Sequence, residues 1–373
     1  MKIGMFTNYY KPSATGVVSS ISLLKHGLEE LGHEVYVFTF SHLGYKDKEK
    51  GIIRIGSIKF EKNNEFDLML PSFGRSIKTI KSLDVIHSHH PVIMGWFGSF
   101  FAELYNKPHV FTYHSQYENY SIYIPFEQRI TKKVTKKIIK NYANKCNCVI
   151  SPSESIKNII LEQGINTRID VVPTGINLEQ FKNGNGLRIR EKHKIPRNKK
   201  ILLYAGRIAK EKNIDLIIRS FNLIAKKRND VVLVILGKGI KKMHLRLLVN
   251  KLRLKKNVVL AGFSESVQDY YDAADLFVFS SPNETQGLVL VEAMASGKPV
   301  VAVESAGAND IINGNNGLLA KNSVKDFSSK ITKILDDDDL RKSMSEEAVK
   351  TSERFSTEIM SKKIESIYKS LLD

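Results

Sequence analysis

The feature of this sequence that most limits its possible folds is a regular alternation of short apolar runs with longer amphipathic segments, which continues from one end to the other. Short apolar runs predict buried strands, and apolar residues spaced three or four apart predict helices. Strands that are separated by helices form parallel sheets through right-handed crossovers. The pattern therefore predicts an α/β protein.

The alternation forms two series, separated by a linker-like segment at 173–176 and a polar loop at 182–186. The first series predicts strands at 2–6, 35–40, 52–56, 84–87, 109–113, 148–151 and 170–172, and helices at 17–31, 92–106, 127–145 and 153–163. The second predicts strands at 201–205, 231–236, 257–260, 276–279 and 299–302, and helices at 213–227, 241–253, 266–273 and 287–296. Residues 356–372 predict a terminal helix. A chain of 373 residues is long enough for two α/β domains, and we expect a ligand cleft between them at the carboxyl ends of the strands.

Composition excludes some classes and leaves others open. No apolar run reaches the about 18 residues of a membrane-spanning helix, and the first residues indicate a buried strand rather than a signal peptide. Cys146 and Cys148 form a lone C-x-C pair, which is a poor zinc site and indicates ordinary thiols in a reducing cytoplasm. The net charge of +18 favours a polyanionic partner, or is simply a solvated basic surface. Both halves of the chain share the excess of positive charge, so only local clusters of charged residues can indicate which partner the protein binds.

Two glutamates border the start of the expected helix at 287–296. Glu284 lies in the loop before this helix, and Glu292 lies within it. A helix N-terminus offers free N–H groups and the positive end of its dipole, which suits a diphosphate. Glu292 has apolar neighbours and therefore needs a partner, such as the hydroxyls of a ribose. The alternative is a helix-entry charge and a solvated face.

Cations follow the strand at 201–205. Gly206 precedes Arg207, whose guanidinium group can bind two phosphate oxygens at once, and Lys212 adds a second positive charge. Departure of a nucleoside diphosphate builds charge on its terminal phosphate, and two fixed cations stabilise that charge without a metal. Lys210 is better interpreted as an ordinary surface lysine.

Glycines mark further strand ends. Gly16 opens the first helix, where the missing side chain lets a phosphate or a sugar approach the backbone, although a plain helix-entry glycine is an equal alternative. Gly237 and Gly239 form a phosphate-side turn or merely a tight turn. The G-x-G-x-x-G fingerprint is absent, which argues against NAD.

Histidines gather at two strand ends. His114 can hydrogen-bond a sugar hydroxyl or steady charge during bond cleavage. For His87, His89 and His90 a structural role is favoured, because no carboxylate set accompanies them to form a metal site. The acidic run at 336–339 indicates a solvated helix start rather than a metal motif.

Together these residues resemble the retaining glycosyltransferase family 4, which has the two-domain GT-B fold. The likeness covers essentially the whole chain. It rests on Gly16, His114 in Thr-Tyr-His, Pro152-Ser153, the hinge at 173–177, Gly206-Arg207 with Lys212, and Glu284-x7-Glu292. Within the family, residues 112–120 and 284–287 resemble bacterial diacylglycerol glucosyltransferases.

The resemblance implies two Rossmann-like domains facing each other across a cleft. Residues 1–173 with a returning helix at 355–373 would bind the acceptor, and residues 174–354 would bind the donor. The implied reaction is retaining transfer of a hexose, with glucose from UDP-glucose as the best choice, to a membrane lipid such as 1,2-diacylglycerol. Catalytic roles fall on His114, Glu284, Arg207 and Lys212. The expected donor-binding residues are Gly16, Arg207, Lys212, Gly237, Gly239, Phe263, Glu284, Thr285, Gln286, Gly287, Leu288 and Glu292. No cofactor and no metal is expected.

A basic helix supports the lipid acceptor. Residues 127–146 carry seven Lys and Arg against one Glu, while Ile130, Val134, Ile138 and Tyr142 recur every four residues. Such a helix can lie on an anionic membrane, and the aromatic segment at 117–126 can enter the interface. The alternative is a stripe that faces the core, with a solvated basic back. The expected acceptor or membrane residues are Tyr10, Tyr117, Tyr120, Lys132, Lys133, Lys136 and Lys137.

Other interpretations stay open. A family 4 enzyme can use GDP-mannose or UDP-GlcNAc and a soluble or different lipid acceptor. A nucleotide-sugar 2-epimerase shares the architecture but needs no acceptor. A nucleic-acid-binding protein would rest on charge alone and would leave the paired glutamates unexplained. We expect a cytoplasmic enzyme peripherally associated with the inner face of the cell membrane, with a nucleotide sugar, a lipid acceptor and an anionic membrane surface as partners, and no nucleic acid.

Overall fold

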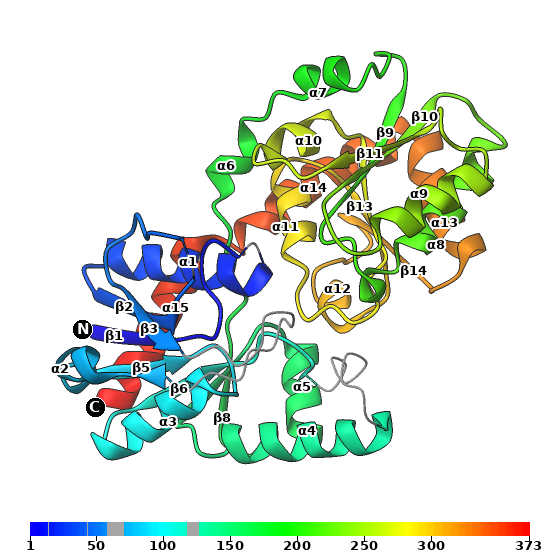
Figure 1. Ribbon diagram of the computed structural model, residues 1–373. Coiled ribbons are helices and arrows are strands. Elements are labelled where there is room, and N and C mark those ends of the chain that lie inside the picture. Colours follow the sequence, from blue (N-terminus) through cyan, green and yellow to red (C-terminus); the bar gives the residue numbers. More distant parts are fainter. Residues whose placement is uncertain (14, 43, 58–70, 118–126) are drawn as a thin grey trace. The chain divides into compact units, whose positions relative to one another are not determined.

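The structure, a computed structural model, describes residues 1–13, 15–42, 44–57, 71–117 and 127–373 (Figure 1). The chain divides into two compact units, each with its own core. Unit 1 comprises Met1–Gly175 and Thr357–Asp373, and unit 2 comprises Ile176–Ser356. The ranges expected from the sequence are 1–173 with 355–373 for one domain and 174–354 for the other. They place both boundaries between the units slightly earlier in the chain than the structure does. Both units contain a mainly parallel sheet between helices, as the alternating pattern predicts.

Unit 1 contains an eight-stranded sheet in the order β4-β3-β2-β1-β5-β6-β7-β8. All neighbouring strands are parallel except β3 and β4. The strands are β1 (Lys2–Phe6), β2 (Glu34–Phe40), β3 (Ile52–Ser57), β4 (Pro71–Ser72), β5 (Val85–Ser88), β6 (His109–Thr112), β7 (Cys148–Ser151) and β8 (Arg168–Val171). The chain order reverses beside β1, which has β2 on one side and β5 on the other. Such a switch point is where parallel sheets bind ligands, at the carboxyl ends of the strands.

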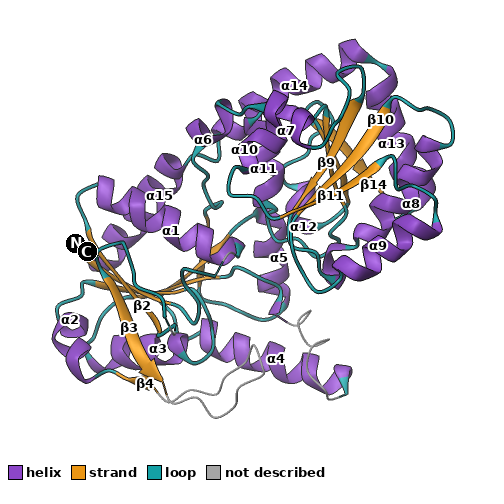
Figure 2. Ribbon diagram, turned by 45° about the horizontal axis from the view of Figure 1, so that its top comes forward, coloured by secondary structure: helices purple, strands orange, loops and turns teal. Residues whose placement is uncertain are grey.

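The helices of unit 1 cover both faces of this sheet. They are α1 (Gly16–Glu30), α2 (Ile77–Lys81), α3 (Met94–Leu104), α4 (Gln128–Ala143), α5 (Glu154–Glu162) and α15 (Thr357–Leu372), with a short 3-10 helix at Gly74–Ser76. Figures 1 and 2 show α1 and α15 on one face and α3 and α4 on the other. The terminal helix α15 packs closely on α1, because a Cβ added at Gly27 would lie 2.0 Å from the Ser361 hydroxyl.

Unit 2 contains a six-stranded parallel sheet in the order β11-β10-β9-β12-β13-β14. The strands are β9 (Lys200–Ala205), β10 (Val231–Leu236), β11 (Val258–Gly262), β12 (Leu276–Phe279), β13 (Val300–Val303) and β14 (Gly317–Ala320). The helices are α6 (Leu178–Lys182), α7 (Gly186–Lys192), α8 (Ile214–Ala225), α9 (Lys242–Lys251), α10 (Val267–Ala273), α11 (Leu288–Ala295), α12 (Ala306–Asn309), α13 (Val324–Asp336) and α14 (Asp338–Glu353), with a 3-10 helix at Lys210–Lys212. The order reverses beside β9, which pairs with β10 and β12.

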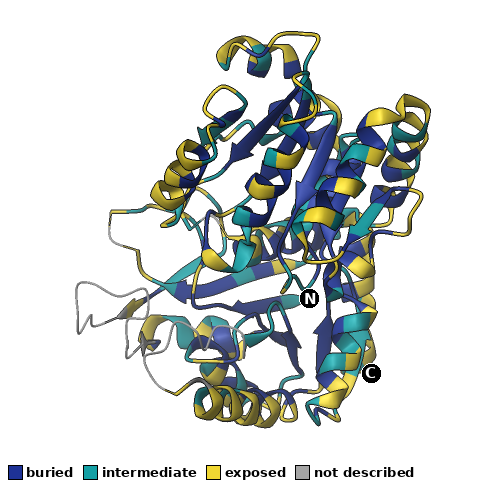
Figure 3. Cartoon of the chain, turned by 90° about the vertical axis from the view of Figure 1, so that its right-hand side faces the viewer, coloured by how far each residue is buried: buried dark blue, intermediate teal, exposed yellow. Residues whose placement is uncertain are grey.

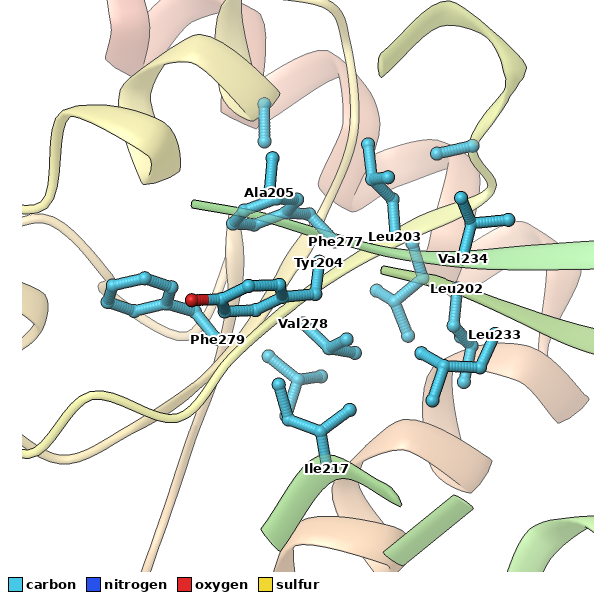
Figure 4. Packing of buried hydrophobic residues seen from close by; sticks show 14 of the residues in the cluster. Leu202, Leu203, Tyr204, Ala205, Ile217, Leu233, Val234, Phe277, Val278 and Phe279 are labelled. Atoms are coloured by element: carbon cyan, nitrogen blue, oxygen red, sulfur yellow. The ribbon is translucent and has the colours of Figure 1, made fainter. Parts of the chain in front are cut away.

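The core of unit 2 explains why its strands are continuous apolar runs. Every residue of β10 is buried, because helices cover both faces of the sheet. Figure 4 shows Leu203 and Tyr204 of β9 packed with Val234 of β10 and Phe277 of β12. In Figure 3 the helices are buried on the side that faces a sheet and exposed on the other side.

Side-chain caps set several helix starts. The Ser153 hydroxyl accepts a hydrogen bond from the Ile156 amide at the start of α5. The carboxylate of Asp337 caps α14 by accepting from the Leu340 amide at 2.8 Å, so the acidic run is a helix start, as predicted. None of the helices in the described part of the chain combines the length and the apolar character that a membrane-spanning segment requires.

Candidate active site

The loops that follow β9, β10 and β11 in unit 2 are joined backbone to backbone. The Gly206 amide donates to the Leu236 carbonyl at 3.0 Å, and the Gly237 amide donates to the Gly262 carbonyl at 2.7 Å. A Cβ added at Gly237 would lie 1.8 Å from the Gly206 carbonyl oxygen, and one at Gly239 would lie 2.2 Å from the carbonyl oxygen of Ile208. Both predicted glycines are therefore needed for this close packing, which fixes the loop that carries Arg207.

The predicted cation Lys212 meets the predicted carboxylate Glu284. The Lys212 ammonium donates to Glu284 Oε2 at 2.7 Å, and the two side chains are 20% and 19% exposed. The same ammonium lies 5.7 Å from the ring centroid of Phe279, and the Ser280 hydroxyl donates to the Lys212 carbonyl. These residues meet because β9 and β12 are neighbours in the sheet, so the loops after them share its carboxyl edge.

Arg207 also holds a carboxylate. Its guanidinium forms an ion pair with Glu211, and the Arg207 side chain is 52% exposed while that of Glu211 is 14% exposed. The Tyr204 hydroxyl donates to the Arg207 carbonyl at 3.1 Å, and burial together with the charges of Glu284 and Glu211 raises the Tyr204 pKa. This edge thus presents two cations, each balanced by a carboxylate.

Glu292 has the partner that its apolar surroundings require. It lies in α11, which begins at Leu288 after Gly287 adopts a left-handed backbone with φ of 77°. The hydroxyl of the buried Tyr271 donates to Glu292 Oε2 at 2.7 Å. Burial raises the pKa of both groups. Tyr271 therefore orients the carboxylate, and sequence reasoning did not find it.

The loop from Glu284 to Gly287 is held from a second side by α12. The Gly307 amide donates to the Glu284 carbonyl at 2.9 Å, and a Cβ added at Gly307 would lie 2.4 Å from the Gln286 amide nitrogen. Gln286 is buried, and Thr285 is half-buried. Gly307 was also missed, because a glycine in a short helix carries no chemical signal of its own.

Phe263, another predicted donor residue, contacts a cation other than Lys212 and Arg207. It follows β11 and is exposed, and its ring centroid lies 4.6 Å from the Lys238 ammonium. Its described partner is therefore a cation from the loop after β10.

In unit 1, His114 lies in a cluster of buried imidazoles. His114 Nε2 is 3.0 Å from His89 Nδ1, and the two rings stack. His87 lies against His89 and is held between the hydroxyls of Tyr368, 2.6 Å from Nδ1, and Thr112, 2.7 Å from Nε2. Burial lowers the pKa of His114 to about 3 and the pKa values of His87 and His89 well below the usual range. His114 is therefore an uncharged hydrogen-bonding group at neutral pH.

The remaining titratable groups near these strands have structural partners. His90 Nδ1 lies 3.0 Å from the Thr7 hydroxyl, as expected for a structural histidine. Cys146 and Cys148 are free and buried, and burial raises the pKa of the Cys148 thiol to about 12. Within the described ranges, no three His, Cys, Asp or Glu side chains are placed to hold a metal ion.

The other predicted site residues of unit 1 differ in their exposure and contacts. Gly16 begins α1 next to open space, and the Thr15 hydroxyl caps the helix. Tyr10 is 2% exposed and donates to Glu49 Oε2 at 2.8 Å, so it does not lie on an exposed surface that a membrane could contact, and its role at the acceptor stays a prediction. Tyr117 packs against Tyr113, and Tyr120 lies outside the described residues, as do its neighbours at 118–126. Gly16 and His114 belong to unit 1, whereas Arg207, Lys212, Glu284 and Glu292 belong to unit 2.

The basic helix α4 exposes both its cations and part of its apolar stripe. Lys132, Lys133, Lys136 and Lys137 are all exposed. Of the four stripe residues, Ile130, Val134 and Ile138 are exposed, and Tyr142 is buried. The core-facing alternative therefore holds for Tyr142 alone.

A second apolar stripe, which the sequence did not reveal, lies on α3. Trp96, Phe100 and Leu104 follow one another at four-residue spacing, and each is more than half exposed. Helices α3 and α4 adjoin, because the Tyr142 hydroxyl donates to the Gly95 carbonyl at 3.2 Å. One face of unit 1 thus combines exposed lysines with two exposed apolar stripes.

Comparison with known proteins agrees with this geometry. Residues 14–180 match the family model described as Glycosyltransferase Family 4, and residues 187–351 match the one described as Glycosyl transferases group 1. An alpha-monoglucosyldiacylglycerol synthase from Streptococcus pneumoniae is 34% identical over 84% of this chain and 73% of its own length. A protein of the same name from Acholeplasma laidlawii is 30% identical over 100% of this chain and 98% of its own.

Solved structures of more distant proteins share the fold. The structure of Anabaena HepE in complex with UDP has a TM-score of 0.82, with 19% identity and 100% coverage of both chains. Sucrose-phosphate synthase from Thermosynechococcus elongatus also has a TM-score of 0.82, with 20% identity, and covers 99% of this chain and 98% of its own. The family matches and these structures together show that the chain belongs to glycosyltransferase family 4 and has the GT-B fold.

Proposed function

We propose that this glycosyltransferase moves a glucosyl residue from UDP-glucose to 1,2-diacylglycerol, with retention of the anomeric configuration and without a metal. The observation that carries the lipid acceptor is the exposed face of α3 and α4, where apolar stripes lie beside four lysines. Two relatives that match most of the chain are named as alpha-monoglucosyldiacylglycerol synthases. A diacylglycerol hydroxyl lies at the bilayer surface, so an enzyme that uses it as the acceptor must dock there to reach it.

Unit 2 supplies the donor site in this proposal. Glu292, already oriented by Tyr271, accepts hydrogen bonds from the ribose hydroxyls, which offset the desolvation of its carboxylate. Arg207 and Lys212 bind the diphosphate, Gln286, Gly287 and Leu288 offer backbone N–H groups to it, and Glu284 contacts the sugar. Each cation holds a carboxylate in the structure, so the diphosphate competes with Glu211 and Glu284 for them.

The reaction exchanges one glycosidic bond for another. The bond between the anomeric carbon and the diphosphate oxygen breaks, and a bond to the acceptor oxygen forms on the same face of the sugar. The acceptor proton passes to the departing phosphate. Arg207 and Lys212 stabilise the charge that develops there, and His114 donates or accepts a hydrogen bond at a sugar hydroxyl as a neutral imidazole.

Docking occurs through unit 1. Anionic headgroups attract basic segments by about 1 kcal/mol for each Lys or Arg near the surface, and exposed apolar side chains add insertion into the interface. The four lysines of α4 are exposed and available for this contact. The association is electrostatic in large part, so salt releases it.

Transfer assays test the reaction directly. We expect labelled UDP-glucose to give a labelled glycolipid with diacylglycerol in phosphatidylglycerol vesicles, and GDP-mannose and UDP-GlcNAc to give little product. A far higher rate with another nucleotide sugar, or with a water-soluble acceptor, contradicts the proposed donor or acceptor.

Vesicle flotation tests the docking surface. Replacing Lys132, Lys133, Lys136 and Lys137 with Ser should reduce both flotation with phosphatidylglycerol vesicles and lipid glycosylation, and leave UDP affinity unchanged. The matched control replaces four cations of unit 2, Lys325, Lys333, Lys342 and Lys350, with Ser. Equal flotation of wild type and the α4 variant contradicts docking through this helix.

A further inference from the structure

A second basic surface lies in unit 2, on α9 and the turns at both of its ends. Residues 238–257 contain eight Lys and Arg and no Asp or Glu. Seven of these eight cations are exposed, and Lys241 is half-buried. The exposed cations are Lys238, Lys242, Arg246, Lys251, Arg253, Lys255 and Lys256. The whole segment therefore presents positive charge to solvent.

The same segment exposes large apolar side chains. Ile240 is 82% exposed, Met243 is 60% exposed and Leu247 is 61% exposed. Their spacing of three and four residues places them along one side of α9 and the turn before it. The core-facing side of α9 is separately provided for by Leu245, Leu248 and Val249, which are buried. The exposed stripe is thus additional to the apolar face that the fold requires.

Cations border this stripe, and Asp215, an acidic residue of the neighbouring helix α8, is already paired with a histidine. Arg246 follows Met243 by three residues and Lys251 follows Leu247 by four, so both are neighbours of the stripe on the helix surface. The carboxylate of Asp215 on α8 pairs with His244, with 2.7 Å between Oδ2 and Nε2. The arrangement has the features of a helix that lies flat on a charged interface, with its apolar side inserted and its cations at headgroup level.

We propose that α9 is a second contact with an anionic lipid bilayer, through which unit 2 binds the membrane separately from α4 of unit 1. A bilayer satisfies both the cations and the three exposed apolar side chains. A nucleic acid backbone would satisfy the cations alone. The proposal shares a membrane partner with the proposed function but requires neither UDP-glucose nor a lipid acceptor.

This contact would hold the donor edge of unit 2 close to the lipid. Ile240 directly follows the Gly237–Gly239 turn, whose Lys238 carbonyl accepts from the Ile208 amide at 2.9 Å. The Lys241 amide in turn donates to the Ile208 carbonyl. The loop that carries Arg207 is therefore tied by its backbone to the start of α9, so docking of α9 restrains that loop relative to the bilayer.

Flotation of the full chain without donor or acceptor tests the contact. One variant replaces Ile240, Met243 and Leu247 with Ser, and a second replaces Lys242, Arg246 and Lys251 with Ser. We expect each to lower the partition coefficient on phosphatidylglycerol vesicles at least about tenfold, with little change on phosphatidylcholine. The matched controls are Leu187→Ser, an exposed apolar residue of α7, and the triple change of Lys342, Lys350 and Arg354 to Ser at α14. Partition coefficients equal to wild type in both α9 variants would overturn the proposal.

A local probe separates insertion from long-range attraction. Because both native cysteines are buried, Met243→Cys offers a selectively labelled exposed thiol. A polarity-sensitive dye on it should shift its emission to shorter wavelength with phosphatidylglycerol vesicles and become shielded from an aqueous quencher. The same dye on Leu187→Cys should not respond. An unshifted, fully quenched dye at position 243 overturns the proposal.

Three further results discriminate among causes. Stabilisation by UDP in a thermal shift assay must persist in the α9 variants, which shows that unit 2 is folded. Loss of self-association in sedimentation, with flotation unchanged, would assign the stripe to a second copy of the chain and overturn the membrane contact. Binding of a DNA duplex that the variants lose, again with flotation unchanged, would do the same in favour of nucleic acid. If wild type floats through α9 yet fails to glycosylate lipid, the proposed function fails and this contact stands.

Discussion

Units 1 and 2 are built on the same plan and differ at the carboxyl edges of their sheets. Both reverse their strand order beside a central strand, β1 in unit 1 and β9 in unit 2. In unit 2 the edge carries the ion pair Lys212–Glu284 beside Arg207. In unit 1 it carries uncharged imidazoles, of which His114 is one. The same sheet topology thus carries a charged carboxyl edge in unit 2 and an uncharged imidazole cluster in unit 1.

The degree of burial explains why the side chains at one edge are charged and those at the other edge are uncharged. The ion pair of unit 2 retains some contact with water, about a fifth of each side chain, so the two charges are paired without full desolvation. The clustered imidazoles of His87, His89 and His114 in unit 1 are buried or half-buried, and a charge on any of them would be poorly solvated and would repel a charge on the others. A charged edge suits a diphosphate, whereas a neutral edge suits hydroxyl groups.

The largest effect should follow from removing charge at the edge of unit 2. We expect Lys212→Ala and Arg207→Ala each to lower kcat/KM for transfer by about 10²–10³, since loss of one preorganised charge-stabilising group costs ~2.7–4 kcal/mol of barrier. We expect Glu292→Gln to lower kcat/KM as well, because it weakens the hydrogen bonds to the ribose hydroxyls. Steady-state kinetics on protein with an unchanged thermal midpoint measures this. Lys210→Ala is the matched control, because Lys210 is exposed on the same short helix. Near-native rates in all three folded variants would show that the charged edge is not the donor site.

The neutral edge should reveal itself in acid. Burial lowers the pKa of His114 to about 3 and those of His90 and His109 to about 4, against about 6.5 in an unfolded chain. Below pH 6.5 the unfolded chain therefore binds more protons than the folded one. As the pH is lowered below 6.5, the free energy of unfolding of unit 1 therefore falls by up to about 1.4 kcal/mol per pH unit for each such histidine.

Unit 2 is the internal control for this acid effect. Burial raises the pKa of Glu292, so its protonation as the pH falls favours the folded state, which is the opposite sign. Burial also lowers the pKa of His193 in unit 2. In unit 1, however, burial lowers the pKa of five histidines, so acid should destabilise unit 1 more. Hydrogen exchange at pH 7 and pH 5, corrected for intrinsic rates, should show a larger loss of protection in unit 1. An equal or greater loss in unit 2 would contradict the contrast.

The sequence predicts many of the long elements of both units well because their signals are local. The buried runs at 231–236 and 276–279 became β10 and β12 with the same bounds. The predicted helix at 17–31 became α1, one residue earlier, where Thr15 caps it. By contrast α2, α6, α7 and α12 were not predicted, because so few residues do not display a helical period, and the longer α13 and α14 were given no ranges of their own.

The site was predictable only where a residue's own neighbours carry the signal. Arg207, Lys212 and Glu284 follow strand ends, and the parallel topology then brings Lys212 to Glu284. Tyr271 was not predictable as the partner of Glu292, since their contact depends on how α10 and α11 pack. The same holds for Tyr368, which reaches His87 from the far end of the sequence. The burial of Tyr10 was not predictable for a related reason, because it depends on a hydrogen bond to Glu49, a residue distant in the sequence.

A smaller effect is expected from the neutral group inside the charged site. Tyr271→Phe removes the hydroxyl that donates to Glu292 and keeps the ring in its packing against Phe181 and Phe277. A hydrogen bond to a charged group contributes ~1.5–3 kcal/mol, and partial replacement by water should leave about a tenfold weaker UDP affinity. Calorimetry on the variant measures it, with Tyr270→Phe as the matched control on the same helix. Unchanged affinity would mean that Tyr271 does not orient the carboxylate.

The last prediction is that a chelator has no effect on the transfer rate. A metal would stabilise the departing diphosphate through positive charge, and in the proposed mechanism Arg207 and Lys212 already supply that charge at the edge of unit 2. The prediction therefore depends on these two cations of unit 2. Initial rates before and after EDTA, followed by excess Mg²⁺, measure the effect. A full loss of rate that Mg²⁺ restores would show that the two cations do not suffice. The Lys212→Ala variant refines the test, because a rate that Mg²⁺ raises in this variant alone would identify Lys212 as the group that takes the place of a metal.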